Sequence, residues 1–541
     1  MILPTPSSLS TLARRGVLEA RSLGAMTRAG VLPLTRPDHV VGLAGAMRRY
    51  GPFGGAVAGA AIAHRDQPAI ADERGTVTYA ELDEMTNRLA NVLRARMLPG
   101  QTVGLLCRNH RSPLVVAFAA SRAGLNTVWL NTSFSPRQAQ EVTARERIDL
   151  VFADADLAGL VADVEVPVVI ADIAAATDEL TELIATGDPA APPAPARPGR
   201  IVLLTSGTTG TPKGAPRAEP KGYTLPGSLL DRMPMRSRET TLIAPPIFHG
   251  VGLIMTMIAL ALGNKVVLRR SFDAETLLAD IAEHRAATIC VVPVMMQRVL
   301  ALAPATLDTY DTSSLRVAFC SGSALPGEVS RQFQDRFGEV IYNLYGSTEV
   351  SVATIATPAD VRDHPTSVGC AALGSRVAIL DDSGRPVPQG GRGRIFVGTV
   401  TPFEGYTGGG GKEIIDGMLA TGDVGHLDEA GRLYVDGRDD DMIVSGGENV
   451  FPAEVEELLI AHPAVREVAV VGVPDEEFGA RLSAFVALHD GAALSVEEVQ
   501  EHVRVNLARY KVPRAVTFLE SLPRNPTGKV LKRELAKAAA S

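Results

Sequence analysis

The segment Thr205–Gly214 carries residue types suited to holding a polyphosphate. Its ten residues include three glycines, four threonines, one serine and Lys213, which is one of only eight lysines in the chain. Glycines let backbone N–H groups crowd around an anion, hydroxyls add neutral donors, and lysine adds a positive charge. A Walker loop has glycine before its lysine and Ser or Thr after it, whereas Pro212 and Gly214 flank Lys213 here. We therefore predict a phosphate-binding loop of another class.

Two further segments add chemistry suited to a nucleotide. Tyr345 ends a short apolar run, where its ring can stack on a purine, and Thr348 and Glu349 supply a hydroxyl for phosphate and an oxygen ligand for Mg²⁺. Asp423 can accept hydrogen bonds from ribose hydroxyls. Taken alone, Tyr345 and Glu349 could instead form a tyrosine corner beside a solvated carboxylate, and Asp423 could cap a turn. The phosphate-type loop in the same chain favours the nucleotide interpretation.

These segments resemble the motifs of the adenylate-forming enzymes, the superfamily of acyl-CoA synthetases, adenylation domains and luciferases. The matches are the phosphate loop, a Tyr-Gly-x-Thr-Glu motif at 345–349, and a ribose-binding Thr-Gly-Asp and Gly-Arg pair at 421–423 and 437–438. The resemblance runs from Pro68 to Arg533 with the motifs in family order. Together with the glycine-rich stretch 403–409, the layout looks most like bacterial fatty-acyl-CoA ligases.

The resemblance implies that ATP, Mg²⁺ and CoA take part in the reaction, and it assigns nucleotide-binding residues. ATP or AMP is expected to contact Thr205, Ser206, Gly207, Thr208, Thr209, Gly210, Lys213, Gly322, Ser323, Ala324, Asn343, Tyr345, Gly346, Ser347, Thr348, Asp423 and Arg438. Among these segments, Glu349 and Thr205 are the expected magnesium ligands.

The same resemblance implies catalytic and moving parts. Lys529, in a Pro-x-Gly-Lys match, is expected to reach from a small domain into the site and act with Glu349, while His249 is interpreted as a positioning residue at the entrance to the acyl pocket. The small domain is expected to rotate about a hinge at Asp440. That rotation would bring the glycine loop into the tunnel for the CoA thiol, at Gly446, Gly447 and Glu448.

Apolar residues occupy the positions that match the family's acyl pocket, namely Phe248, Val251, Leu253, Met255, Val294, Met295 and Met296. No acidic residue stands among them to hold an α-amino group, and methionines suit flexible alkyl chains. We therefore predict activation of a medium- or long-chain fatty acid to acyl-AMP and transfer to CoA. An aryl-acid CoA ligase and an acyl-AMP ligase that loads a carrier protein remain alternatives. A catalytically dead scaffold is disfavoured because Lys529, Glu349 and Asp423 are all present.

Composition indicates a globular protein of several domains. The 541 residues exceed what one hydrophobic core accommodates, and 46% are apolar and 21% charged. A net charge of −8 argues against a nucleic-acid partner. The four cysteines lack C-x-x-C spacing, which indicates reduced thiols rather than disulfides or a zinc site. Since no apolar run reaches the roughly 18 residues of a membrane span, we expect a cytoplasmic enzyme that acts on a small-molecule acid.

Alternating strands and helices from Pro68 onward predict parallel sheets covered on both faces. Short strands and glycine-rich turns after Ser367 predict a small β-barrel or an antiparallel sheet. The expected fold class is α/β, with a large N-terminal domain of stacked α/β sheet subdomains plus a small β-barrel, and a smaller mobile α+β C-terminal domain. We place an N-terminal extension at 1–60, the large domain at 61–437 and the small domain at 438–541.

The N-terminal extension is basic. Its first 49 residues hold seven arginines against Glu19 and Asp38. The segment could lie on a membrane surface as a peripheral contact or could pack as extra helices on the large domain. We favour packing because Pro33 and Pro37 interrupt the helical pattern. The sequence does not indicate an oligomeric state.

Overall fold

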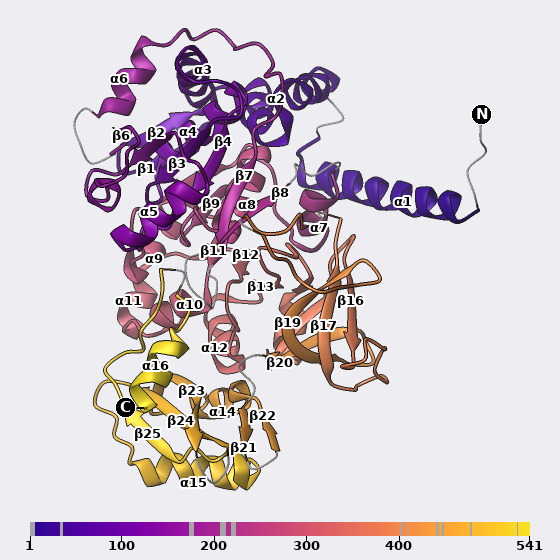
Figure 1. Cartoon of the computed structure of the whole chain (residues 1–541), viewed down its shortest axis with the longest axis vertical. Helices are drawn as coiled ribbons and strands as arrows, with labels where there is room; N and C mark the ends of the chain where they lie inside the picture. The colour runs from indigo at the N-terminus through magenta and orange to yellow at the C-terminus, as the bar shows by residue number, and fades with distance from the viewer. Residues whose placement is uncertain are drawn as a thin grey trace.

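The computed structural model describes residues 6–32, 36–172, 178–205, 213–217, 223–400, 403–407, 409–439, 443–445, 448–475, 479–526 and 528–540. A large domain carries the nucleotide motifs, and a small C-terminal domain lies below it in Figure 1. The α/β fold class with a large N-terminal and a small C-terminal domain is confirmed.

The first sheet of the large domain positions the phosphate loop. Its strand order is β6-β5-β3-β4-β7-β8, and all neighbours are parallel except the β7–β8 hairpin. The strands are β3 (Thr102–Leu106), β4 (Asn126–Trp129), β5 (Leu150–Ala153), β6 (Val168–Ile170), β7 (Ile201–Thr205) and β8 (Lys213–Arg217). The first residue of the predicted phosphate loop, Thr205, therefore ends β7, and its last two residues, Lys213 and Gly214, begin β8 at one edge of this sheet.

The second sheet positions the adenosine motifs. Its strand order is β16-β17-β19-β20-β15-β14-β13-β12-β11-β9-β10-β1-β2, with β18 paired to β19. The strands are β1 (Pro68–Asp72), β2 (Gly75–Thr78), β9 (Thr240–Ile243), β10 (Lys265–Leu268), β11 (Thr288–Val291), β12 (Val317–Cys320), β13 (Ile341–Tyr345), β14 (Thr354–Ala356), β15 (Ser367–Ala371), β16 (Arg376–Leu380), β17 (Gly393–Gly398), β18 (Ile414–Ile415), β19 (Met418–Leu427) and β20 (Arg432–Arg438).

The β-rich region expected after Ser367 is antiparallel. Its strands hydrogen-bond onto the parallel part of the second sheet through β14 and β15, so strand pairing joins the region to that sheet instead of closing it as a separate unit. As a result, one continuous sheet contains β13, β19 and β20, the strands that carry three of the nucleotide motifs.

Helices cover both sheets, and several begin at a residue whose side chain caps the helix. Thr78 and Glu81 form a capping box at the start of α3, with the reciprocal hydrogen bonds of that motif. All thirteen residues of α4 are buried, because α4 packs against α2 and α3 as well as against β3 and β4. The helices here are α3 (Tyr79–Arg96), α4 (Arg111–Ala123), α5 (Pro136–Arg145), η1 (Ala158–Val161), α6 (Glu179–Thr186), α7 (Thr224–Arg232), α8 (Gly250–Ala261), α9 (Ala274–His284), α10 (Pro293–Leu300), α11 (Pro304–Thr309), α12 (Gly327–Phe337) and α13 (Pro358–Asp363).

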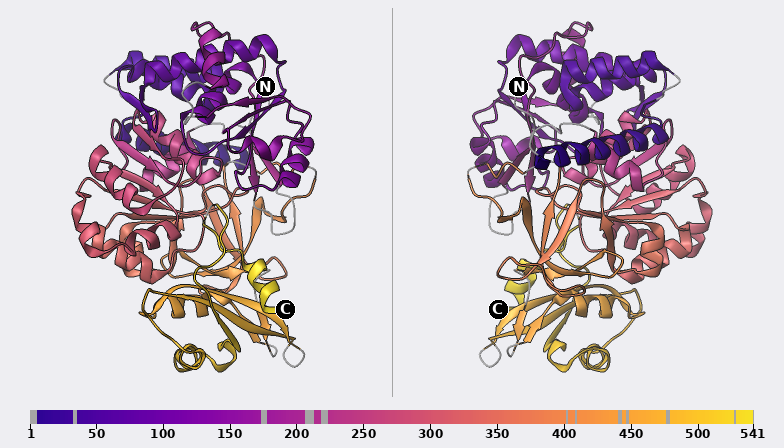
Figure 2. Two further views of the ribbon diagram at one scale, coloured as in Figure 1. Left: turned by 90° about the vertical axis from the view of Figure 1, so that its left-hand side faces the viewer. Right: turned by 90° about the vertical axis from the view of Figure 1, so that its right-hand side faces the viewer.

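The N-terminal extension forms two helices that pack on the large domain. In α1 (Pro6–Ala29), the Glu19 carboxylate accepts a hydrogen bond from Tyr223 N at 3.0 Å, and Ser22 is buried where Gly227 leaves room for it. Figure 2 shows α1 lying across the flank of the large domain. The packing expected for this segment is thus observed, and contact with a membrane surface stays a prediction.

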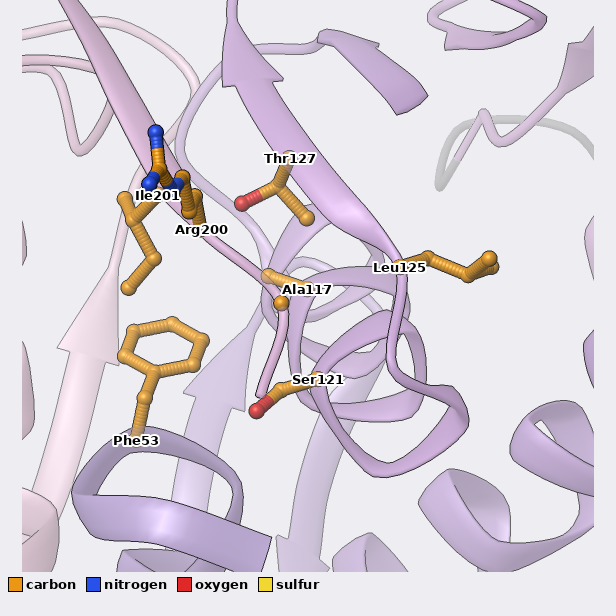
Figure 3. Close-up of a pocket in the computed structure, with 8 residues that line it drawn as sticks. Phe53, Ala117, Ser121, Leu125, Thr127, Arg200 and Ile201 are labelled. Carbon is orange, nitrogen blue, oxygen red and sulfur yellow. The ribbon is translucent and has the colours of Figure 1, made fainter. Parts of the chain in front are cut away.

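The second helix, α2 (Pro37–Ala63), is kinked at Gly51 and continues the core. The Phe53 ring lies 5.0 Å from that of Phe118 on α4. Figure 3 shows Phe53 facing Ile201 at the start of β7, with Ala117 and Ser121 of α4 beside it. The crevice among these side chains leaves no space for a water molecule. None of the helices in the described ranges combines the length and apolar character needed to cross a membrane.

The small domain is a three-stranded sheet flanked by helices. Its sheet has the order β23-β24-β25, and a separate β21–β22 hairpin precedes it. The elements are β21 (Ile443–Ser445), β22 (Glu448–Val450), α14 (Pro452–Ile460), β23 (Val465–Asp475), β24 (Gly479–Leu488), α15 (Val496–Asn506), η3 (Arg509–Lys511), β25 (Ala515–Phe518) and α16 (Lys532–Ala540). The predicted hinge Asp440 and the loop residues Gly446 and Gly447 lie outside the described residues. For Glu448, the backbone pairs with Ser445 across the hairpin.

Candidate active site

Three predicted adenosine-binding residues meet at the end of β13. The Tyr345 hydroxyl donates to Asp423 Oδ2 at 2.5 Å, and Arg438 Nη1 lies 3.6 Å from Asp423 Oδ1. Asp423 on β19 is the cross-strand partner of Arg438 on β20, so the antiparallel register brings these two side chains together. Burial, and then the charge of Asp423, raise the pKa of the Tyr345 hydroxyl, which therefore stays a hydrogen-bond donor at neutral pH.

The segment that carries the predicted nucleotide-binding residues Gly322, Ser323 and Ala324 lies beside Tyr345. β12 and β13 are parallel neighbours, so their carboxyl ends meet at one edge of the sheet, and the Ser321 hydroxyl donates to Leu344 O at 3.0 Å. Gly322, Ser323 and Ala324 are exposed in this turn, and Gly322 adopts a φ of 97° that favours glycine. An exposed turn of small residues beside an aromatic ring leaves room for a flat purine.

The other predicted nucleotide residues around β13 differ in exposure. Asn343 is buried in the strand, whereas Thr348 is half-buried in the turn that follows. A side chain at Gly346 would meet the carbonyl oxygen of Ser351 at 1.9 Å, so only glycine fits there. The backbone at Gly346 is therefore fixed by the turn that carries Ser347, Thr348 and Glu349.

The Glu349 carboxylate is held by two hydroxyl groups. Ser347 Oγ donates to Oε2 at 2.8 Å, and Tyr406 Oη donates to Oε1 at 2.6 Å. Burial raises the pKa of Glu349, but the hydrogen bonds from Tyr406 and Ser347 and the charge of Lys412 outweigh it and lower the pKa below its usual value. Glu349 is thus a charged carboxylate in a partly buried position.

This donor set fits a magnesium ion. Mg²⁺ prefers carboxylate and hydroxyl oxygens and usually binds through one or two carboxylates plus substrate phosphates. An ionised carboxylate whose oxygens are already oriented by neighbouring hydroxyls satisfies that requirement at Glu349. For Thr205, the second predicted ligand, the structure describes the backbone: it pairs with Lys213 at the end of the β7–β8 hairpin where the phosphate loop begins.

The phosphate loop itself lies mostly outside the described residues. Ser206, Gly207, Thr208, Thr209 and Gly210 fall in the gap between β7 and β8. Lys213 begins β8, is exposed, and places its Nζ 5.6 Å from the centre of the Tyr406 ring. Because Tyr406 also contacts Glu349, the hairpin end and the predicted magnesium ligand lie on two sides of the same tyrosine.

The predicted catalytic lysine lies on a turn of the small domain that faces the large domain. The turn is closed by Gly528 N donating to Asn525 O and by Asn525 N donating to Lys529 O, each at 2.9 Å. Lys529 is exposed. A Cβ atom added to Gly528 would lie 2.4 Å from Val294 Cγ1, so the turn packs directly against the start of α10. The structure therefore brings Lys529 close to the predicted acyl pocket.

The predicted acyl-pocket residues line the interior of the large domain. Phe248, Leu253, Met255, Val294, Met295 and Met296 are buried, and Val251 is half-buried. A cavity of about 180 Å³ lies next to them. Its lining combines apolar side chains, among them Phe248, Phe272 and Met295, with the basic side chains of Arg108, Arg269 and Arg270. Pro526, from the turn that carries Lys529, also lines this cavity.

His249 caps the start of α8 without a side-chain hydrogen bond. Its ring lies 4.4 Å from that of Phe248, and its Nε2 atom is buried with no hydrogen-bond partner among the described residues. Burial lowers the pKa of His249 to about 4. The imidazole is therefore neutral at physiological pH, which suits the positioning role predicted for it better than proton transfer.

Four residues at the site were not predicted from the sequence: Glu146, Tyr406, Thr407 and Lys412. Thr407 N donates to Gly214 O at 2.9 Å, and Thr407 Oγ1 donates to Glu146 Oε1 at 2.6 Å. Lys412 Nζ lies 3.4 Å from Thr421 O. Lys412 could have been noticed as one of few lysines beside a glycine run. Glu146 carries no local signal, since its partner is 261 residues away in the chain.

Comparison with known proteins places both domains in one family. The family model of AMP-binding enzymes matches residues 58–407, and the model of the AMP-binding enzyme C-terminal domain matches residues 454–529. The first match covers most of the large domain and the second most of the small domain.

Similar proteins agree in sequence and in structure. A feruloyl-CoA synthase of Amycolatopsis sp is 33% identical, over 85% of this chain and 93% of its own. The long-chain-fatty-acid–CoA ligase FadD13 of Mycobacterium tuberculosis is 29% identical, over 85% and 92%. The crystal structure of ATP-bound MatB from Rhodopseudomonas palustris has a TM-score of 0.79 and 29% identity, over 87% of this chain and 96% of that one. From the assembled nucleotide motifs and these matches, the chain belongs to the AMP-binding enzymes, the adenylate-forming superfamily that includes the CoA ligases.

Proposed function

We propose that this AMP-forming acid–thiol ligase activates an apolar carboxylic acid, of the medium- or long-chain fatty-acid class, and transfers it to CoA. The observation that carries the proposal is the lining of the predicted acyl pocket. Phe248, Leu253, Val294 and Met295 are all buried and apolar, and neither segment 247–260 nor segment 292–300 contains an acidic residue. An acid that carries a cationic group would find no carboxylate partner on these segments.

In the first half-reaction, a carboxylate oxygen attacks the α-phosphorus of ATP and pyrophosphate leaves. A carboxylic acid is already ionised at neutral pH, so no general base is needed and a neutral His249 is compatible with the step. The protein must align two negatively charged reactants. Lys213 would hold the triphosphate, Lys529 would bridge the carboxylate and the α-phosphate, and Tyr345 and Asp423 would hold the adenosine.

Magnesium, held by Glu349, would supply positive charge to neutralise the leaving pyrophosphate. In the second half-reaction, the CoA thiol attacks the acyl carbonyl of the adenylate, the acyl–oxygen bond breaks and AMP leaves. The small domain would rotate between the two steps, which removes the turn bearing Lys529 from Val294.

The cavity beside Phe248 and Met295 constrains the chain length. Its volume of about 180 Å³ is below the roughly 300–1,000 Å³ of common ligand pockets. A long alkyl chain therefore requires the walls to rearrange, and unbranched methionine side chains such as Met295 and Met296 allow that at low cost. An aryl acid is the second candidate, because Phe248 in this wall could stack on an aromatic ring and a feruloyl-CoA synthase is among the relatives.

The proposal is tested by measuring pyrophosphate release and acyl-CoA formation with a panel of acids, each with and without CoA. Fatty acids of six to sixteen carbons, ferulic acid and benzoic acid form the panel. We expect pyrophosphate release with fatty acids and acyl-CoA when CoA is present. Strict dependence on an aromatic acid would overturn the fatty-acid assignment. Accumulation of acyl-AMP in the presence of CoA would instead indicate a carrier protein as acceptor.

A further inference from the structure

The segment Phe403–Thr407 contacts two parts of the candidate site: Gly214 on the β7–β8 hairpin and Glu349 in the turn after β13. It follows β17 and precedes Lys412, and its turn is closed by Tyr406 N donating to Gly410 O at 3.2 Å and Gly409 N donating to Tyr406 O at 3.1 Å. Gly405, Gly409 and Gly410 have φ values above 90°, a conformation that side chains rarely adopt. These glycines give the chain the tight turn that points Tyr406 and Thr407 into the site.

Thr407 attaches this turn to the phosphate hairpin. Its N–H donates to Gly214 O at 2.9 Å, and its Oγ1 accepts from Gly214 N at 2.9 Å while donating to Glu146 Oε1 at 2.6 Å. A Cβ atom at Gly214 would lie 2.6 Å from Thr407 Oγ1 and 2.9 Å from Glu146 Oε1. Only glycine at 214 permits this approach, so the residue next to Lys213 is held on both its backbone groups.

Tyr406 attaches the same turn to the opposite side. Its hydroxyl donates to Glu349 Oε1 at 2.6 Å, and its ring lies 5.6 Å from Lys213 Nζ and packs edge-on against Phe403 with the ring centres 4.8 Å apart. The tyrosine therefore contacts a lysine of the phosphate hairpin with its face and a carboxylate of the Tyr-Gly-x-Thr-Glu motif with its hydroxyl.

We propose that Tyr406 and Thr407 are positioning residues that set the separation of Lys213 and Glu349, and so prepare the site for a triphosphate rather than for the nucleoside. A triphosphate with its metal must be met on both sides at once. The hydrogen bonds of Tyr406 and Thr407 go to Glu349, Gly214 and Glu146, whereas Tyr345 and Asp423, the residues proposed to hold adenosine, bond to each other. The inference rests on the proposed ATP-dependent function. It predicts a selective effect: loss of either contact weakens binding of the triphosphate and leaves binding of AMP unchanged.

The test measures binding, not turnover, by isothermal titration calorimetry of the full chain in magnesium buffer. The probes are α,β-methylene-ATP, which is not cleaved at the α-phosphate, and AMP. For Tyr406→Phe we expect about tenfold weaker binding of the ATP analogue and unchanged binding of AMP. Tenfold is the lower end of the loss in affinity that follows when a residue hydrogen-bonded to a metal ligand is removed. Tyr310→Phe is the matched control, because it removes a tyrosine–carboxylate hydrogen bond, to Glu275 Oε1 at 2.9 Å, on the surface.

A second pair of variants keeps the proposal testable if Tyr406→Phe fails to fold. Thr407→Val removes the hydroxyl at constant shape and should weaken the ATP analogue in the same selective way, whereas Thr407→Ser should restore it. Equal affinity of Tyr406→Phe and the unmodified protein for the analogue would overturn the proposal, and so would an equal loss of AMP affinity. If the unmodified protein itself bound neither nucleotide, the proposed function would fail instead.

Discussion

The contact between Glu457 and Gly327 offers a sharp test of how the small domain docks. Glu457 on α14 belongs to the small domain, and its Oε1 accepts a hydrogen bond at 2.6 Å from the N–H of Gly327, the first residue of α12 in the large domain. The residue before that helix is Pro326, which provides no side-chain cap. Glu457 thus supplies, from the small domain, the negative partner that a helix N-terminus favours.

The expected size of the effect follows from two opposing contributions. A hydrogen bond to a charged group stabilises by about 1.5–3 kcal/mol. Burial raises the pKa of Glu457 although Gly327 and Arg331 lower it, so desolvation of the carboxylate offsets part of that gain. We expect Glu457→Ala to destabilise the docked arrangement by about 1–2 kcal/mol, a roughly 5- to 30-fold change in its population.

The assay separates the two half-reactions. In the proposed mechanism, pyrophosphate release requires the docked turn with Lys529, whereas thioester formation from supplied acyl-AMP does not. We expect Glu457→Ala to slow the first by roughly 5- to 30-fold and to leave the second unchanged, and Glu457→Gln, which keeps an acceptor oxygen, to lie close to the unmodified enzyme. Glu501→Ala is the control. Glu501 also belongs to the small domain, but it pairs with Arg504 on its own helix, α15, and not with the large domain. A parallel loss of both half-reactions would refute the reasoning.

Three further predictions concern the turn and the buried histidines. Gly528→Ala should slow adenylation without unfolding the protein, because its φ is 80° and the new methyl would lie 2.4 Å from Val294; unaltered pyrophosphate release would show that the turn does not dock there. Lys529→Ala should abolish pyrophosphate release yet spare thioester formation from supplied acyl-AMP. Equal losses in the two half-reactions would exclude the proposal that Lys529 acts in the first step alone. Burial lowers the pKa of His64 and of His249 to about 4 from 6.5, so the unfolded chain binds more protons between these values. The free energy of unfolding should therefore fall as pH drops from about 6.5 to about 4, by up to about 1.4 kcal/mol per pH unit for each histidine. Urea titrations of His64→Gln should give a shallower fall, and an identical pH dependence would contradict the burial argument.

Residues in contiguous motifs could be predicted from the sequence, because their chemistry and spacing are local. Tyr345 and Asp423 are the clearest case: each stands in a short motif, and the structure joins them by a hydrogen bond of 2.5 Å. The α/β class was also predictable, since strand and helix periods alternate from Pro68 and caps such as Thr78 stand at helix starts. The antiparallel connection of β14 and β15 to the parallel sheet was not, because pairing between strands leaves no signal within either strand.

Contacts between distant segments account for what the sequence did not show. Thr407 meets Gly214 across 193 residues and Glu146 across 261. Gly214 stands in the phosphate-loop motif, but nothing in that motif or in the segments around Thr407 and Glu146 indicates that the three residues meet. The same holds for Glu457 and Gly327, which lie in different domains. In both cases the partner side chain approaches the backbone so closely that only glycine, which has no side chain, fits at 214 and at 327. The need for glycine at these positions becomes visible only in the folded chain.

Relative specificity for the acid tests the central claim most directly. The enzyme is given ATP, magnesium and CoA together with equal concentrations of dodecanoic acid and ferulic acid, and the two acyl-CoA products are quantified by mass spectrometry. The apolar lining by Phe248, Leu253, Val294 and Met295 predicts that dodecanoyl-CoA predominates. Predominance of feruloyl-CoA, or formation of neither thioester while AMP accumulates, would contradict the account.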